Sequence, residues 1–207
     1  MKKTAFSDWT RGSLTMTFDL KRVNNHPILE DWLNVERKPL TDFEQQYLAF
    51  LQDNLRDRID TWNEMDLREQ LIGPLFTILK IYGKHYRYYA AKKLSGIVGN
   101  YLISGEVDAV IASGIDEPQK PYFCFYEYKP EKDPNKHPFG QTLAAMMVAQ
   151  EHNKHAFPVY GCYVMGRNWY FLILKGKEYS ISVDYSVTKD ELYDIHAILS
   201  KLKTIIF

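Results

Sequence analysis

Tyr122-Phe-Cys-Phe-Tyr-Glu127-Tyr-Lys129 is the stretch of sequence that decides the fold. Its aromatic and apolar residues are typical of a β-strand, and Pro130 directly after it marks the end of that strand. Glu127 and Lys129 are two residues apart, so their side chains point to the same face of the sheet. Charges on a buried or half-buried strand need partners, or a metal ion, to offset the loss of water. We therefore expect a polar site at this end of the strand.

The segment Glu106–Ala112 is predicted to pair with this strand as an antiparallel hairpin. In a pairing that is symmetric about the intervening loop, the opposed residues are Asp108 and Glu127, Val110 and Phe125, and Ala112 and Phe123. Directly opposed residues have Cβ atoms about 4.5–5.5 Å apart, and two carboxylates that close repel unless a positive charge lies between them. An oxygen-only pair suits Mg²⁺ or Mn²⁺ better than Zn²⁺.

Outward from the hairpin, the hydrophobic periodicity predicts helices and strands in the order ααβββαβββα, whereas residues 1–40 are irregular in pattern. Capping boxes at Thr41–Glu44 and Thr188–Glu191 mark two helix starts. The predicted elements are helices 41–62, 64–81 and 139–153, a closing helix from residue 188, and strands 93–104, 106–112, 122–129, 159–165, 169–174 and 179–183. This order predicts an α/β (α+β) fold, a mixed β-sheet flanked by helices.

The length and pattern of the chain indicate one domain. It has 207 residues and no internal repeat, low-complexity tract or linker. We divide the domain into an N-terminal irregular segment (1–40), a core (41–165), and C-terminal strands and a helix (166–207).

Composition narrows the class of protein. No apolar run approaches the roughly 18 residues of a membrane span, and polar residues interrupt the N-terminus where a signal peptide would be apolar. Cys124 and Cys162 lie in apolar strands and are expected to be buried, reduced thiols, which favours a cytoplasmic location. The 26 basic residues balance the 26 acidic ones, which disfavours coating of nucleic acid by bulk charge but allows an enzyme that contacts a few phosphates.

Two segments resemble a known family. Gly105-Glu-Val-Asp108-Ala-Val-Ile111, followed by Glu127-Tyr-Lys129, resembles the PD-(D/E)XK nuclease superfamily, with Val107 in place of the proline. The restriction-endonuclease-like core of that superfamily, a helix, a β-meander, a helix and a strand, agrees with residues 64–165. The helix from Glu64 to Leu75 is similar to the E-x-x-x-R-x-x-x-I-x-P-L helix in the nuclease-like region of type I restriction subunits and related bacterial proteins.

The resemblance assigns further residues to the site. In that helix pattern Glu64 is the acid of the site, Arg68 pairs with it, and Glu69 is a second choice for the same role. Gln141 begins the helix after Glu-x-Lys, where many of these nucleases place a glutamine. The chain departs from the RecB-like branch, which has a tyrosine where this sequence has Ala145.

Together these matches imply a Mg²⁺- or Mn²⁺-dependent nuclease that hydrolyses phosphodiester bonds, with DNA favoured over RNA. A homodimer would let it make paired cuts, and no membrane is involved. The implied catalytic residues are Glu64, Asp108, Glu127, Lys129 and Gln141. The implied metal ligands are Asp108, Glu127, the backbone carbonyl of Tyr128, and Glu64 through a water molecule.

Two other functions are compatible with the sequence, so enzymatic activity is left open. One is a catalytically inactive, nuclease-like interaction module, which the balanced charge favours. The other is a metal-dependent hydrolase of a different phosphate ester. An isolated Glu-x-Lys is usually an exposed ion pair. The nuclease hypothesis therefore requires that Glu64, Asp108, Glu127 and Lys129 converge on one hollow that solvent can reach.

Overall fold

The computed structural model describes residues 1–130 and 138–205, with the backbone alone for 124–126. The strands are β1 Lys2–Ala5, β2 Lys21–Arg22, β3 Arg87–Val98, β4 Tyr101–Ser113, β5 Gln119–Lys129, β6 Val159–Met165, β7 Asn168–Lys175, β8 Glu178–Ile181 and β9 Tyr185–Ser186. The helices are η1 Phe6–Asp8, α1 Arg11–Phe18, α2 Pro27–Leu33, α3 Asp42–Arg56, η2 Ile59–Thr61, α4 Glu64–Leu67, η3 Arg68–Ile72, α5 Gly73–Leu79, α6 Pro138–His152 and α7 Glu191–Ile205.

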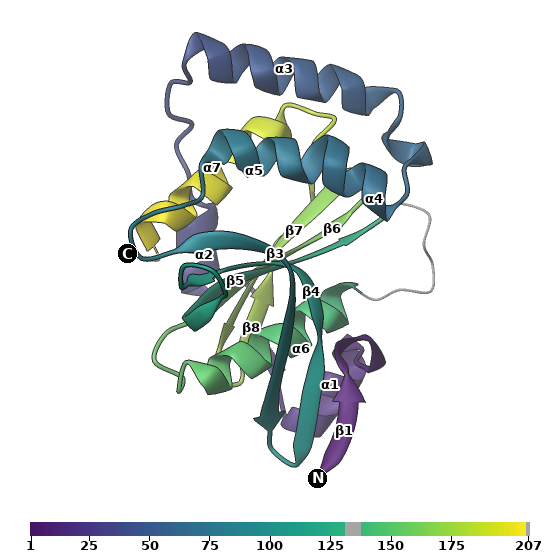
Figure 1. Ribbon diagram of the computed structural model, residues 1–207, viewed down its shortest axis with the longest axis vertical. Coiled ribbons are helices and arrows are strands. Elements are labelled where there is room, and N and C mark those ends of the chain that lie inside the picture. Colours follow the sequence, from purple (N-terminus) through teal and green to yellow (C-terminus); the bar gives the residue numbers. More distant parts are fainter. Residues whose placement is uncertain (131–137, 206–207) are drawn as a thin grey trace.

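Within the described residues, the strands form one nine-stranded mixed sheet with the main order β1-β4-β5-β6-β7-β8-β2. β3 pairs with β4, and β9 pairs with β7. Helices cover both faces, with α3, α5 and α7 on one side and α1 and α6 on the other (Figure 1). The predicted mixed β-sheet flanked by helices is thus confirmed.

Each face of the sheet has its own hydrophobic core. Along β4, Ala109 and Ile111 belong to the core under α3, α5 and α7, whereas Val110 and Ala112 belong to the core under α1 and α6. This alternation follows from the two-residue period of a strand. Because both faces are covered, a charged side chain in the middle of the sheet has no direct route to water, and charge is tolerated only where the sheet opens.

The sheet opens along one edge of β4. β3 pairs with one edge of β4 along nearly its whole length, so β1 and β5 share the other edge. β1 pairs with residues 101–104 and β5 with residues 109–113. Residues 105–108 lie between these two pairings, so Asp108 is placed where β5 diverges from β4.

The predicted hairpin register is correct near the site and wrong toward the loop. Val110 pairs with Phe125, as predicted. Ala112 pairs with Tyr122 rather than with the predicted Phe123, because the register shifts between Ile111 and Ala112. A β-bulge of this kind inserts a residue into one strand, which symmetry about the loop cannot reveal.

The predicted break between strands 93–104 and 106–112 is wrong. β4 runs through Gly105, and the turn between β3 and β4 lies at Gly99, where φ is +55°. Gly105 has a packing role instead, since a Cβ atom there would lie 2.5 Å from the ring of Phe6. A glycine inside a strand often marks such a close approach.

The prediction that residues 1–40 are irregular is also wrong, because this segment contains β1, α1, β2 and α2. β1 pairs in parallel with β4 and β2 with β8. Strands of two to four residues carry no readable period, so their pairing depends on partners far away in the sequence.

The two predicted N-terminal helices are shorter or less regular than expected. α3 starts with the predicted Thr41–Glu44 capping box but ends at Arg56, and its residues Phe43 and Phe50 are exposed. The helix predicted over 64–81 contains a π-helical turn, η3, directly before Pro74. Proline cannot donate a backbone hydrogen bond, which is one cause of such irregular turns.

At the C-terminus, α7 begins at residue 191, three residues later than predicted, and its leucines and isoleucines from Leu192 to Leu202 are fully buried. Within the described residues, every helix falls short of the length and apolar character that a membrane span requires.

Candidate active site

The ammonium group of Lys129 lies among three carboxylates. Its Nζ atom is 2.8 Å from Oε1 of Glu127, 3.3 Å from Oε2 of Glu64 and 3.7 Å from Oδ2 of Asp108. Glu127 and Lys129 end β5, Asp108 lies on β4, and Glu64 begins α4, which is beside the end of β5 in Figure 1. The structure therefore brings together the four side chains that the sequence singled out, which we call the acidic–lysine cluster.

Glu64 is held in place by a helix cap. The Asn63 side chain accepts hydrogen bonds from the N–H groups of Met65 (2.8 Å) and Asp66 (3.0 Å), and the Asp66 carboxylate accepts one from the Asn63 N–H (3.1 Å). This reciprocal cap fixes the first turn of α4. An acidic residue is also favoured at a helix N-terminus by the helix dipole. Glu64 thus reaches the sheet from a rigid position.

Where β4 and β5 diverge, the side chain of Asp108 takes the place of the hydrogen bonds between the two backbones. The β4–β5 pairing ends in this direction at Ala109 and Tyr126, so the register brings Asp108 next to Glu127, as predicted. The N–H of Tyr128 donates a 2.7 Å hydrogen bond to Asp108 Oδ2. Because the N–H and C=O groups of one strand residue point to the same side, the Tyr128 carbonyl also faces Asp108.

The backbone opposite Asp108 is strained. The β3–β4 register pairs Ala90 with Ala109 and Lys92 with Val107, which leaves Ala91 opposite Asp108. Ala91 has φ of +50°, in the left-handed region that costs about 1–2 kcal/mol for a residue with a side chain. Strained residues that the surrounding structure enforces are found at functional sites more than elsewhere.

The cluster is buried at its centre and exposed on one side. Glu127 and Lys129 are each 5% exposed, whereas the side chain of Asp108 is 23% exposed and that of Glu64 is 41% exposed. Solvent therefore reaches the cluster from the α4 side. Tyr128 belongs to the core under α5, so the alternation of β5 directs Glu127 and Lys129 to the opposite face, which α6 covers.

Burial and mutual repulsion change the protonation of the carboxylates. Burial, followed by the charge of Asp108, raises the pKa of Glu127 to about 7. Burial also raises the pKa of Asp108, although the charge of Lys129 and the Tyr128 N–H oppose this change. Glu127 thus exchanges its proton near neutral pH, which is the range useful for acid–base chemistry.

Lys129 remains protonated. Burial alone would lower its pKa, but the charges of Glu127 and Asp108, the hydrogen bond to Glu127 and the charge of Glu64 together raise it. One ammonium faces three carboxylates, so the cluster has an excess of negative charge. Arg68 offsets part of this excess, since its charge lowers the pKa of Asp108.

The donor atoms of the cluster are of the chemical type that hard divalent cations prefer. Asp108, Glu127 and the Tyr128 carbonyl offer oxygen ligands only, which is the set that Mg²⁺ and Mn²⁺ prefer. Their surplus negative charge would also be relieved by a cation. In residues 1–130 and 138–205, however, no group of three or more His, Cys, Asp and Glu side chains is spaced to hold a metal ion. In this arrangement Lys129 supplies the positive charge at the centre of the cluster.

Other residues proposed from the sequence lie outside the cluster. Gln141 is half-buried in the first turn of α6, and in the described part of the chain no hydrogen bond joins it to the cluster. Glu69 is exposed. Glu64 forms an ion pair with Lys129, and its pairing with Arg68 stays a prediction. Cys162 is a buried free thiol, as predicted, whereas the side chain of Cys124 lies outside the described residues.

Sequence reasoning missed two residues that shape the cluster. Asn63 could have been found, because Asn63-x-x-Asp66 is a capping pattern directly before Glu64. The strained conformation of Ala91 leaves no sign in the sequence, because alanine is compatible with an ordinary strand.

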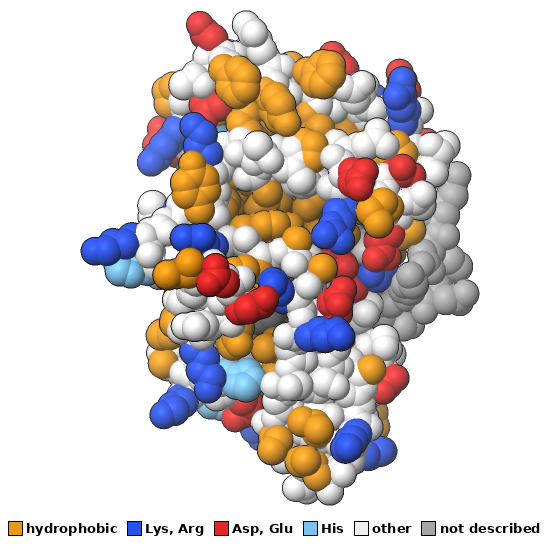
Figure 2. Space-filling model, in the orientation of Figure 1, with side chains coloured by type: hydrophobic (Ala, Val, Ile, Leu, Met, Phe, Trp, Pro, Cys, Tyr) orange, Lys and Arg blue, Asp and Glu red, His pale blue; other side chains and the backbone are white. Residues whose placement is uncertain are grey.

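The surface near the cluster has mixed charge. Figure 2 shows acidic and basic side chains interspersed over the region beneath α4, beside a hollow lined by hydrophobic side chains. On this face the lysines and arginines form no continuous basic field, in agreement with the balanced composition. Affinity for a polyanion would therefore depend on a few local contacts.

No protein-family model matches the chain, and no curated protein is similar enough to count as a relative.

Proposed function

We propose that the acidic–lysine cluster hydrolyses phosphodiester bonds with the help of Mg²⁺ or Mn²⁺, and that its substrate is a nucleic acid, DNA rather than RNA. The observation that carries this proposal is the position of Lys129 Nζ, within 4 Å of carboxylates from two strands and a helix, at the point where β4 and β5 diverge. An ammonium and several carboxylates on the solvent-reachable side of a sheet are the groups that phosphoryl transfer requires.

The order of elements supports a restriction-endonuclease-like core. The helical stretch from α4 to α5 precedes the antiparallel strands β3, β4 and β5, and α6 then connects β5 to β6, which is parallel to it. This is the helix, meander, helix and strand expected from the resemblance. Asp108 and the Glu127-x-Lys129 pair occupy the central strands of this arrangement, as the family motif requires.

Each residue of the cluster has a role that its position supports. Asp108, Glu127 and the Tyr128 carbonyl would hold the cation, which supplies charge neutralisation at the phosphate and activation of the attacking water. Lys129 Nζ would then donate to a phosphate oxygen, where it stabilises the charge of the transition state. Glu64, on the exposed side, would orient the attacking water by accepting a hydrogen bond from it. Gln141 lies outside the cluster, and in this proposal it would position Lys129 or the substrate once the substrate is bound.

A second function is favoured by a specific observation. Lys129 is already paired with all three carboxylates, and within the described residues no three-ligand metal group is present. A cluster whose carboxylates are all already paired with Lys129 could serve only to stabilise a nuclease-like interaction module. A metal-dependent hydrolase of a smaller phosphate ester is a third function, which the same ligands would serve.

The discriminating experiment is a cleavage assay with plasmid, linear and single-stranded DNA, and RNA, with and without Mg²⁺ or Mn²⁺. We expect metal-dependent cleavage by the wild-type protein, strongest on DNA, and loss of cleavage in Asp108→Asn and Lys129→Met. Asp190→Asn, which changes the same residue type in a surface ion pair, is the matched control and should cleave as wild type does.

Metal binding separates the three functions. Lys129→Met should abolish cleavage yet bind Mn²⁺ at least as tightly as wild type, because the ammonium competes with a cation for the carboxylates. Binding of Mn²⁺ without cleavage of any polymer, together with hydrolysis of a small phosphodiester, would indicate the third function. The absence of both Mn²⁺ affinity and cleavage would show that the interaction module is correct and that the nuclease proposal is wrong.

A further inference from the structure

A second site lies away from the acidic–lysine cluster. A cavity of about 920 Å³ that is open to solvent on one side is lined by residues 34–40, the first turn of α3, and Asp190 with α7 from Tyr193 to Thr204. This volume is in the range of pockets that take small molecules, about 300–1,000 Å³. None of the four cluster residues lines it. The cavity is therefore independent of the proposed nuclease function.

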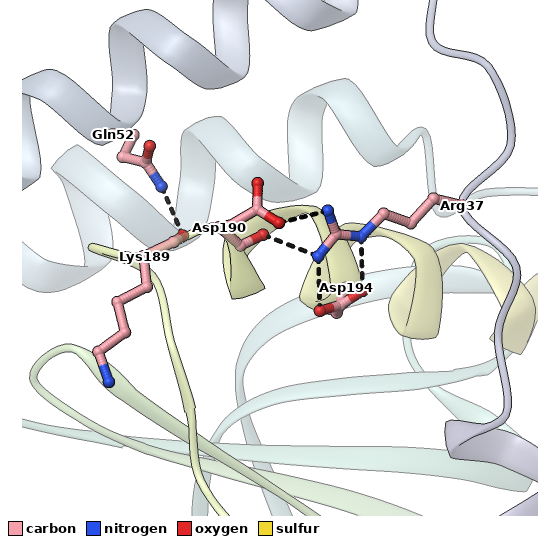
Figure 3. Close-up of polar contacts among 5 residues, drawn as sticks. All are labelled: Arg37, Gln52, Lys189, Asp190 and Asp194. Carbon is pink, nitrogen blue, oxygen red and sulfur yellow. Dashed lines mark hydrogen bonds and ion pairs between the residues drawn. The ribbon is translucent and has the colours of Figure 1, made fainter.

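The wall of the cavity is held by a network of ion pairs. Arg37 lies between two acidic residues of the chain around the start of α7 (Figure 3): its Nη1 is 2.6 Å from Asp190 Oδ2, and its Nε and Nη2 are 2.6 and 2.7 Å from the carboxylate of Asp194. Gln52 of α3 donates a 2.6 Å hydrogen bond to the Lys189 carbonyl nearby. These contacts join the segment around Arg37, α3 and α7, so the cavity has a defined shape without a ligand.

A buried polar group lines this cavity. His196 of α7 is only 9% exposed and forms part of the cavity lining. Its ring makes no hydrogen bond with the described residues. Burial lowers the pKa of His196, so at neutral pH the ring is uncharged and carries one N–H donor and one acceptor nitrogen. A buried ring without a protein partner needs water or a ligand to satisfy it.

Ammonium groups gather beside His196. Lys38 and Lys203 both line the cavity. Burial lowers the pKa of Lys203, and the positive charges of Lys80 and Lys38 lower it further, against the opposing effect of Glu44. Glu44 is engaged elsewhere, because its Oε2 accepts hydrogen bonds from the N–H and hydroxyl of Thr41, both at 2.8 Å. Over the whole lining, four cations (Arg37, Lys38, Lys201 and Lys203) face three carboxylates (Glu36, Glu44 and Asp190), so positive charge is in excess.

The rest of the lining mixes apolar and polar side chains. Val35, Pro39, Leu40 and Ala197 supply aliphatic surface, and Tyr193 supplies a ring. A ligand that fills the cavity would thus meet the lysines beside His196 and, beyond them, apolar surface between polar side chains. Lys203 Nζ already donates to the Leu79 carbonyl at 2.9 Å, and an ammonium has two further hydrogens for a ligand.

We infer that this cavity binds a small organic anion, a phosphate or carboxylate group on an apolar or aromatic body. Lys38 and Lys203 hold the charged group, and His196 donates its N–H to it or to a neighbouring polar atom. The apolar side chains of the lining contact the body of the ligand. Pairing with an anion removes the repulsion among the lysines and satisfies the histidine ring at once.

The test is a titration of the whole protein with four probes: phenyl phosphate, benzoate, inorganic phosphate and benzyl alcohol. Binding is monitored by ¹⁵N-resolved NMR. Phenyl phosphate or benzoate should bind more tightly than both inorganic phosphate, which lacks the apolar body, and benzyl alcohol, which lacks the charge. Whichever aromatic anion binds better identifies the charged group. The shifted amides should lie in residues 34–45 and 193–204.

Variants decide whether the proposed residues hold the anion. Lys203→Gln and Lys38→Gln should each weaken binding about tenfold, the usual effect of losing one charge-assisted hydrogen bond. Lys38→Gln should leave the fold intact, because Lys38 is exposed and makes no hydrogen bond or ion pair within the described residues. A loss of binding in this variant therefore cannot be attributed to a folding defect. Lys177→Gln, an exposed lysine paired with Asp19, should leave binding unchanged. Equal binding of benzyl alcohol and phenyl phosphate, unchanged affinity in both cavity variants, or amide shifts elsewhere in the chain would overturn the inference.

Discussion

Two regions of this protein hold a cation between carboxylates, and they differ in exposure and in charge balance. At the acidic–lysine cluster, Lys129 meets three carboxylates and is 5% exposed. At the wall of the cavity, Arg37 meets two carboxylates, and its side chain is 39% exposed. The first arrangement is buried and negatively charged overall, whereas the second is largely solvated and has one negative charge in excess.

The difference teaches how to separate a functional ion cluster from a structural one. In the Arg37 network each carboxylate has good geometry to the guanidinium, and water screens what charge is left. In the acidic–lysine cluster the low-dielectric surroundings strengthen the repulsion between carboxylates, which raises the pKa of Glu127 to about 7. A protein that only needed stability would gain more from apolar residues at such a position. The retained charge is therefore our reason to assign chemistry to the cluster.

The largest effect is expected for Lys129→Met. Removal of the ammonium leaves buried carboxylates without their counter-charge, and breaking a buried ion pair in this way costs about 3–5 kcal/mol. Urea unfolding at neutral pH should show this loss in the free energy of unfolding. Millimolar Mg²⁺ should restore part of the loss in the variant, because a cation can take over the charge balance. A loss below about 1 kcal/mol, as at an exposed pair, would remove the contrast between the two regions.

The second effect concerns pH. Glu127 has a folded-state pKa above its ordinary value, so the folded protein binds more protons than the unfolded chain between about pH 4.5 and 7. Its contribution to stability is therefore present at low pH and is lost as the pH rises through 7. In Glu127→Gln this loss should be absent. The free energy of unfolding of the variant, relative to that of wild type, should therefore rise by about 3 kcal/mol from pH 4.5 to pH 8.

Unfolding curves of both proteins across that pH range provide the check, since the difference between them removes the contribution of all other groups. Two parallel stability profiles would mean that Glu127 titrates normally and that the cluster is not under electrostatic strain.

A smaller effect is expected for Ala91→Gly, beside the cluster. Glycine adopts positive φ without a steric cost, so the substitution should raise the free energy of unfolding by about 1 kcal/mol after the extra flexibility of the unfolded chain is subtracted. Thermal unfolding would detect this as a higher Tm. If the strain serves the alignment of Asp108, cleavage should fall in the same variant. A lower Tm would show that Ala91 is not strained in the protein.

The smallest effect is expected for Arg37→Met. Pairs between partly exposed charges contribute about 1 kcal/mol or less, because water and salt screen them. Urea unfolding in low and high salt should therefore show a small loss that shrinks further as salt is added. A loss as large as that of Lys129→Met would indicate that the Arg37 network is buried and cooperative, and the distinction between the two regions would fail.

The sequence predicted the centre of the site better than its surroundings. Glu127 and Lys129 follow from a strand period, and Asp108 follows from the symmetry of a hairpin, both of which are local rules. Glu64 was placed by resemblance, because no local rule connects a residue on α4 to β5. Gly105 was misread as a turn, since its role depends on Phe6, which comes from a distant part of the chain.

The cavity was invisible in the sequence for the same reason. Its walls come from residues 34–45 and 190–204, and the positions of Lys38 and His196 on them have no common period or motif. The short strands β1 and β2 were missed because parallel partners far along the chain define them. Local pattern thus predicts elements and faces, whereas contacts between distant segments create the pocket and the strained backbone.

The most direct test of the central claim is a Mn²⁺ titration followed by electron paramagnetic resonance on wild type, Asp108→Asn and Asp190→Asn. The two variants remove one carboxylate charge each, one from the acidic–lysine cluster and the other from the surface network. We expect wild type and Asp190→Asn to bind Mn²⁺ alike and Asp108→Asn to lose that binding. Equal affinity in all three proteins, or none in wild type, would contradict the assignment of a cation-dependent site to Asp108 and Glu127.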